Sequence, residues 1–172
     1  MMAFLILTVF SMCMILAMFT DMFTMKIPNR LVLALIGAFV IFAPIAGMSL
    51  ATAGWHFLIA AIVLVGGFAL FSFGLFGAGD VKFASATALW IGTSGTLEYL
   101  VLAAVFGGIA ALLLICVRQV ALPLSLLKIE WVDRLHNKKT GIPYGIALGP
   151  AALMVFPQTP WMAYIHSSTL IG

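Results

Sequence analysis

Charged residues are scarce in this sequence. Only 8% of its 172 residues are Asp, Glu, Lys or Arg, whereas 65% are hydrophobic. A water-soluble domain of this composition would have too few polar side chains to cover its surface. The formal net charge of +3 is too small to favour nucleic acid as a partner. The composition therefore predicts an all-α, polytopic membrane protein that contacts membrane lipid and no nucleic acid.

Cysteine clusters and metal-binding patterns are also missing. Cys13 and Cys116 are the only cysteines, both lie in apolar runs, and no Cys-x-x-Cys occurs. This spacing excludes a disulfide framework and a zinc knuckle. The sequence also lacks His and carboxylate spacing suited to a catalytic metal, and it lacks a phosphate-binding Gly-x-x-x-x-Gly-Lys-Ser/Thr motif. We therefore expect neither a metal nor an organic cofactor.

Long apolar runs dominate the remainder. A spanning helix needs roughly 20 mostly apolar residues, and six segments are candidates, at about 3–20, 31–47, 56–76, 83–91, 99–117 and 143–156. The fourth is short and rich in Ala, Ser and Thr. The first lacks the flanking basic residues and the Ala-x-Ala site of a secretory signal peptide, so we expect it to be retained. Trp55, Trp161 and Tyr164 are expected to lie at the membrane–water interface.

The basic residues fall into alternate loops if six segments span the membrane. All eight lie after the first, third or fifth segment: Lys26, Arg30, Lys82, Arg118, Lys128, Arg134, Lys138 and Lys139. The positive-inside rule then places these loops in the cytoplasm and both termini outside it. We expect residues 1–172 to form a single transmembrane domain of the plasma (inner) membrane, with a cytoplasmic loop at about 118–142.

That loop carries apolar residues at helical spacing. Leu124, Leu127, Trp131 and Leu135 recur at intervals of three or four residues among charged ones. The pattern predicts one short amphipathic helix on the inner leaflet. A charged connector held by anionic lipid is the simpler interpretation, and a substrate-docking element is the alternative.

Two aspartates are predicted to meet at the cytoplasmic boundary. Asp21 follows the first segment and Asp80 follows the third, which runs in the same direction, so both reach the same depth. Two close carboxylates in a partly dry site cannot both ionise readily, and such a pair can share one proton and activate a water. Alternatively, Asp80 caps the fourth segment and Asp21 is a solvated flank. Lys82 is either an ordinary positive-inside residue or a group that sets the charge of Asp80.

Three motifs resemble those of the type IV prepilin peptidases, which are membrane aspartic proteases. The stretch from Gly77 to Lys82 resembles their Gly-x-Gly-Asp-x-Lys motif. Asp21, together with the Lys-Ile-Pro-Asn stretch at residues 26–29, resembles the region around their first catalytic aspartate. Pro143-Tyr144-Gly145 is similar to the opening of their last segment. The order of the three motifs along the chain makes the resemblance specific.

The resemblance implies a prepilin peptidase domain with Asp21 and Asp80 as the catalytic pair. Gly77 and Gly79 would shape the second aspartate's loop, and Lys82, Pro28, Asn29, Pro143, Tyr144 and Gly145 would have supporting roles. The substrate would be a prepilin or pseudopilin precursor, whose basic leader is cleaved at the cytoplasmic face. The short link after Asp21 has no paired cysteines, so we expect no methyltransferase function. The small size is similar to the tight-adherence (Flp) branch.

Other functions fit parts of the pattern. An archaeal preflagellin peptidase shares the aspartate pair, and a presenilin-like intramembrane protease shares Gly-x-Gly-Asp. A small ion-coupled transporter would use the same aspartates as proton or cation sites, although no internal repeat is visible. A non-catalytic membrane subunit would need them only for assembly.

Overall fold

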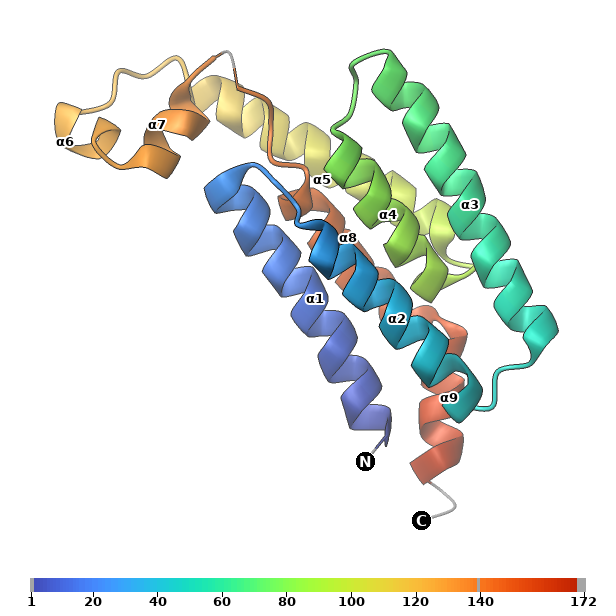
Figure 1. Ribbon diagram of the computed structural model, residues 1–172. Helices are drawn as coiled ribbons and strands as arrows, with labels where there is room; N and C mark the ends of the chain where they lie inside the picture. Colours follow the sequence, from blue (N-terminus) through green and yellow to red (C-terminus); the bar gives the residue numbers. More distant parts are fainter. Residues whose placement is uncertain (1, 139, 170–172) are drawn as a thin grey trace.

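Helices joined by short connections make up the part of the chain that the computed structural model describes, residues 2–138 and 140–169 (Figure 1). Lys139, one of the eight basic residues, lies outside the described residues. No strand occurs within the described ranges. The predicted all-α class is therefore confirmed.

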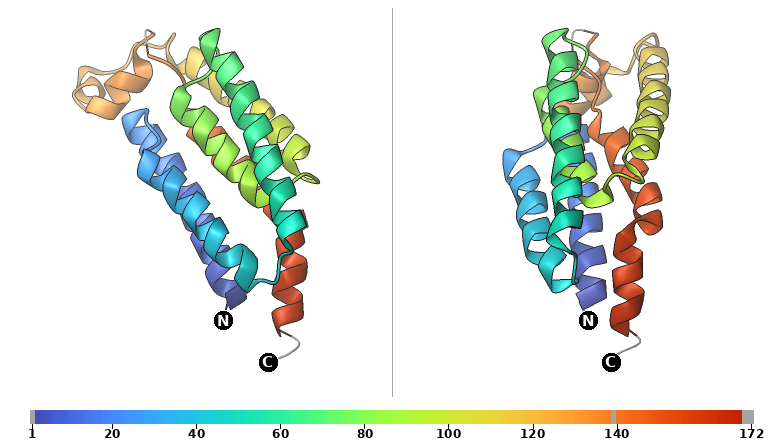
Figure 2. Two further views of the ribbon diagram at one scale, coloured as in Figure 1. Left: turned by 45° about the vertical axis from the view of Figure 1, so that its right-hand side comes forward. Right: turned by 90° about the vertical axis from the view of Figure 1, so that its right-hand side faces the viewer.

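The longer helices run alternately up and down a bundle. The first five are α1 (Met2–Thr24), α2 (Asn29–Ile45), α3 (Leu50–Ser72), α4 (Ala78–Ile91) and α5 (Thr96–Val117). Two short helices follow, α6 (Leu124–Leu127) and α7 (Glu130–His136), and the chain ends with α8 (Gly145–Val155), the 3-10 turn η1 (Phe156–Gln158) and α9 (Pro160–Thr169). The start of α1 and the end of α9 lie at one end of the bundle, and α6 and α7 lie at the other (Figures 1 and 2).

Three helices are long and apolar enough to cross a membrane. These candidate spans are Phe4–Thr24, Leu50–Ser72 and Thr96–Val117. Their outer surfaces are largely apolar and exposed, as expected for helices that face lipid. The helices Asn29–Ile45 and Gly145–Gln158 are apolar but shorter. The chain is a membrane protein, while the count of six spans stays a prediction.

The short α4 lies inside the bundle. Every residue from Phe83 to Ile91 is buried, and the helix packs against α2, α3 and α8. The Ser85 hydroxyl donates to the Ala60 carbonyl at 2.8 Å. Surrounding helices can thus satisfy polar groups that lipid could not. Because other parts of the chain bury α4 from Phe83 to Ile91, its sequence does not need the length and hydropathy of a lipid-facing span.

Trp161 is a core residue, so its predicted interfacial position is wrong. Its side chain is fully buried, and its indole N–H donates to the Trp90 carbonyl at 2.7 Å. The two indole rings lie 5.0 Å apart. Trp90 is one of the last residues of α4, where carbonyls lack partners within the helix. Trp161 therefore closes the end of the central helix. Trp55, by contrast, is 60% exposed.

Trp161→Phe is expected to destabilise the fold. Phenylalanine cannot donate to the Trp90 carbonyl, and an unsatisfied buried acceptor costs about 1–3 kcal/mol. Thermal unfolding of the purified protein in detergent should show a lower midpoint. Trp55→Phe, which removes the same indole from an exposed site, should change stability by no more than about 0.5 kcal/mol. Equal midpoints for the two variants would contradict the role assigned to Trp161.

The predicted single amphipathic helix of the long loop is interrupted. It consists of α6 and α7, separated at Lys128 and Ile129. Arg118 at the end of α5 explains how the loop is held, because its guanidinium donates to the carbonyls of Leu135 and Gly141 at 2.7 and 3.0 Å. These bonds tie the start and the end of the loop together over one end of the bundle.

Candidate active site

Asp21 is positioned by α1 itself. The prediction that it follows the first helix is wrong, because the helix continues to Thr24. The helix ends where Met25 adopts a φ of 57°, and the Met25 N–H donates to the Asp21 carbonyl at 2.7 Å. The Asp21 side chain is only 3% exposed, and its Oδ2 accepts the backbone N–H of Gly145 at 2.6 Å. Asp21 is therefore enclosed and oriented, and it is not a solvated flank.

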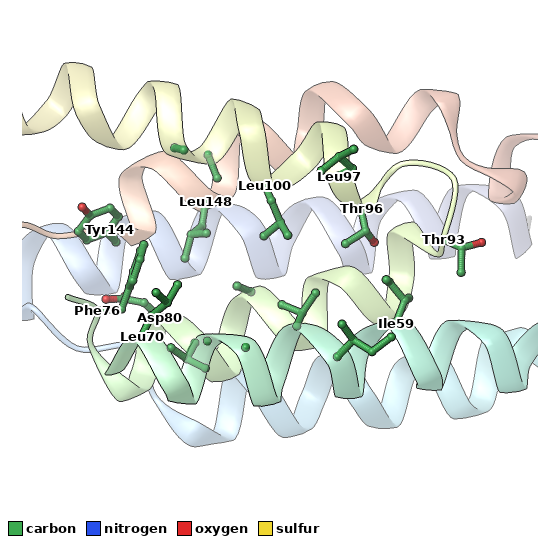
Figure 3. Close-up of a pocket in the computed structure, with 18 residues that line it drawn as sticks. Ile59, Leu70, Phe76, Asp80, Thr93, Thr96, Leu97, Leu100, Tyr144 and Leu148 are labelled. Atoms are coloured by element: carbon green, nitrogen blue, oxygen red, sulfur yellow. The ribbon is translucent and has the colours of Figure 1, made fainter. Parts of the chain in front are cut away.

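Asp80 lies in the first turn of α4, three residues after the N-cap Gly77. Its carboxylate folds back on the Gly77 backbone and accepts a hydrogen bond from it, which is how an acidic residue at this position caps a helix. A Cβ added to Gly77 would lie 2.7 Å from the Asp80 Oδ2. Gly77 therefore leaves the space that the carboxylate occupies. Asp80 also lines a cavity (Figure 3). Its carboxylate therefore caps the helix and is also available to a molecule in that cavity.

The two carboxylates meet at the end of the bundle opposite the start of α1. They are close enough for their charges to interact. The Asp80 carboxylate also interacts with the Gly77 backbone and, through its charge, with Tyr99, and no Lys or Arg among the described residues is part of this set. Two neighbouring carboxylates without a cation between them favour the state that holds one proton. Such a pair offers one group that accepts a proton and one that donates it.

The third motif places the start of α8 against Asp21 and at the cavity that Asp80 lines. A Cβ on Gly145 would lie 2.7 Å from the Asp21 Cβ and 3.1 Å from the Ala17 carbonyl oxygen, so only glycine fits this contact. Tyr144 lines the cavity beside Asp80, and Pro143 before it is buried. Gly145 therefore reaches one carboxylate while its neighbour Tyr144 flanks the other.

The first and second motifs also contact each other. The Lys82 Nζ donates to the Asn29 Oδ1 at 3.4 Å, which links α4 to the start of α2. Pro28 is the N-cap of α2 and is exposed. A Cβ on Gly79 would lie 3.7 Å from the Ile27 carbonyl oxygen, an ordinary contact. Lys82 and Asn29 thus connect the starts of α4 and α2. At Gly79, by contrast, a larger residue would meet no steric clash in this conformation.

The long loop packs against the end of α1 that carries Asp21. Arg134 of α7 donates to the Phe23 carbonyl at 2.8 Å, and the rings of Phe23 and Trp131 meet edge to face at 5.3 Å. The Phe23 carbonyl is among those at a helix end that lack partners within the helix. The loop thus holds the last turns of α1 in place and, with them, the position of Asp21 along the bundle.

Two residues at the site were assigned no role from the sequence. The Phe76 ring lies 5.0 Å from the Tyr144 ring. A Cβ on Gly107 of α5 would lie 2.8 Å from the Tyr144 Cε1. A usable signal was the Gly107-Gly108 pair within a strongly apolar helix, since small residues mark close contacts in membranes. Phe76 gave no signal beyond its place next to the Gly-x-Gly-Asp motif.

Comparison with known families identifies the chain. The family model described as the type IV leader peptidase family matches residues 8–112, a range that contains Asp21 and Asp80 but ends before Gly145. Searches of curated proteins and of solved structures found no match. The matched range covers more than half of the 172 residues. The chain therefore belongs to the type IV leader peptidase family.

Proposed function

We propose that this protein is a small prepilin peptidase of the tight-adherence (Flp) kind, and that Asp21 and Asp80 are its catalytic residues. The meeting of these two carboxylates at one end of the bundle, with interacting charges, carries the proposal. Membership of a leader peptidase family supports proteolysis as the reaction. The substrate is a pilin or pseudopilin precursor with a basic leader followed by an apolar helix.

In this mechanism the aspartate pair activates one water. The ionised carboxylate accepts a proton from the water as its oxygen attacks the scissile carbonyl, and the protonated carboxyl donates a proton to the carbonyl oxygen. The resulting gem-diol collapses with proton transfer to the leaving amine, so no covalent enzyme intermediate forms. Asp80, which lines the open cavity, faces the substrate. Asp21 lies behind the first turn of α8, where the Gly145 N–H orients it.

The reaction is assigned to the cytoplasmic face of the inner membrane. Lys26 lies in the connection between α1 and α2, Arg30 and Lys82 lie near the starts of α2 and α4, and the other basic residues fall between α5 and α8 in the sequence. The connections between α2 and α3 and between α4 and α5 have no Lys or Arg. The positive-inside rule favours the cytoplasm for the basic end. A precursor anchored by its apolar helix would present its leader at this boundary.

Co-expression with candidate precursors tests the proposal. Small proteins with a basic leader before one apolar helix are expressed with the wild-type protein or with Asp80→Ala, and their masses are measured. Wild type should remove the leader, and Asp80→Ala should leave the precursor intact. Cleavage within the apolar helix would instead favour a presenilin-like protease. Intact precursors with both proteins, together with ion transport by purified wild type in liposomes, would favour a transporter.

A further inference from the structure

A lateral groove extends from the aspartate end along the bundle. α3 packs against α4, and α5 packs against α8, so that α3 and α5 stand apart. The space between them forms a cavity of about 600 Å³. Asp80, Phe76 and Tyr144 lie at one end of it, and Thr93 lies at the other (Figure 3). We call this cavity the α3–α5 groove.

The lining of the α3–α5 groove is almost entirely apolar. Asp80 is its one charged residue among those the structure describes. Apolar walls are contributed by side chains such as Ile59, Ile62, Leu70 and Leu100. Both flanking helices belong to the candidate membrane spans. The groove therefore opens toward lipid along its length and meets a charged group only at the aspartate end.

We infer that the α3–α5 groove binds the apolar helix of the precursor, with the leader continuing past Asp80. This inference rests on the proposed function. If the scissile bond lies beside Asp80, the precursor's apolar helix, which follows that bond, must start next to Asp80. The groove starts at Asp80 and leads away from it between two membrane helices. An apolar helix therefore has a continuous apolar path from the cleavage point.

The size of the groove fits one face of a helix. Its lining on α3 runs from Ile59 to Leu70, about 16 Å at a rise of about 1.5 Å per residue. A helix of that length and about 10 Å in diameter encloses roughly 1,300 Å³. The cavity of about 600 Å³ holds about half of this. One side of the substrate helix would contact α3 and α5, and the other would stay in lipid.

Small residues permit this contact. Gly66 of α3 and Ala104 of α5 both line the groove and are exposed. A Cβ on Gly66 would meet no atom within 4 Å. Helices associate in membranes largely through close packing at small residues. Bulk added at Gly66 would therefore occupy the groove without disturbing the fold.

Gly66→Trp tests the inference, with Gly108→Trp as its matched control. Gly108 is also an exposed helical glycine with no atom within 4 Å of an added Cβ, but it does not line the groove. Using a precursor that wild type processes in the co-expression assay, Gly66→Trp should slow processing by about 10-fold or more, because overfilled contacts are unfavourable. Gly108→Trp should process at the wild-type rate.

Cross-linking tests occupancy independently of activity. Cys13 and Cys116 are replaced by serine, and a single cysteine is introduced by Gly66→Cys, Ala104→Cys or Gly108→Cys. Single cysteines are also placed along the precursor helix. Gly66→Cys and Ala104→Cys should form disulfides at precursor positions three or four residues apart, and Gly108→Cys should form none.

The outcomes separate the two proposals. If wild type processes no precursor, the proposed function fails and the groove inference fails with it. If wild type processes a precursor, but Gly66→Trp matches Gly108→Trp, only the groove inference fails. Absence of cross-links from both Gly66→Cys and Ala104→Cys would show that lipid, and not the precursor, occupies the groove.

Discussion

Asp21→Asn and Asp80→Asn are each expected to lower precursor processing by about 1,000-fold or more, the scale of lost acid–base catalysis. An amide oxygen at position 21 would still accept the Gly145 N–H that now lies 2.6 Å from the Asp21 Oδ2. An amide at position 80 would likewise still accept a hydrogen bond from the Gly77 backbone. Both substitutions therefore preserve the local structure while removing the group that takes up or donates a proton.

Asp133→Asn is the matched control for these two variants. Asp133 is an exposed carboxylate on α7, and its replacement should leave processing unchanged. Measurement requires the mass of the precursor after co-expression, with each peptidase variant quantified in the membrane. Processing by Asp21→Asn at the wild-type rate would refute the paired mechanism, even if Asp80→Asn were inactive. Loss with Asp133→Asn would point to assembly and not to catalysis.

Composition was sufficient to predict the helical class, and the order of the motifs pointed to Asp21 and Asp80 as a pair. Burying an acidic residue in a membrane is energetically costly, so acidic residues are rare in an apolar chain. This sequence has only five, and each could be considered as a functional residue. Alternation of helix direction then predicted that Asp21 and Asp80 lie at the same end, and in the structure their carboxylates are close enough for their charges to interact. The family model supports the resemblance on which the peptidase assignment depended.

Contacts between distant residues could not be predicted in this way. Asp21 and Gly145 are 124 positions apart, and their hydrogen bond depends on how α1 packs against α8. Trp161 was misplaced for a related reason. A tryptophan beside a proline near a helix end looks like an interfacial anchor, and its burial depends on Trp90, 71 positions earlier.

The end of the first helix also differs from the sequence prediction, because α1 continues to Thr24. The polar residues after Thr20 suggested that the first helix stops there, but Thr20 and Thr24 donate their hydroxyls to the carbonyls of Leu16 and Thr20 within the helix. Hydroxyl groups that bond to the preceding turn can remain in an apolar helix. The helix therefore carries Asp21 within its last two turns, which makes the aspartate more rigid than a loop residue would be.

Gly145→Ala is expected to lower processing by about 100-fold, the scale associated with a displacement of about 1 Å in a catalytic group. The added Cβ would lie 2.7 Å from the Asp21 Cβ and 3.1 Å from the Ala17 carbonyl oxygen. Neither atom is the end of a flexible side chain, so α8 must move away from α1. That movement would lengthen the Gly145–Asp21 hydrogen bond and carry Tyr144 away from its position beside Asp80.

Gly141→Ala provides the comparison, because a Cβ at Gly141 would meet no atom within 4 Å. It adds the same methyl group four residues earlier and should process precursor like wild type. Precursor mass and the amount of peptidase in the membrane are measured for both variants. A rate for Gly145→Ala within a factor of two of Gly141→Ala would show that Asp21 does not depend on this contact. A selective loss with Gly145→Ala at normal abundance would instead extend the catalytic unit to α8, a helix outside the matched range of residues 8–112.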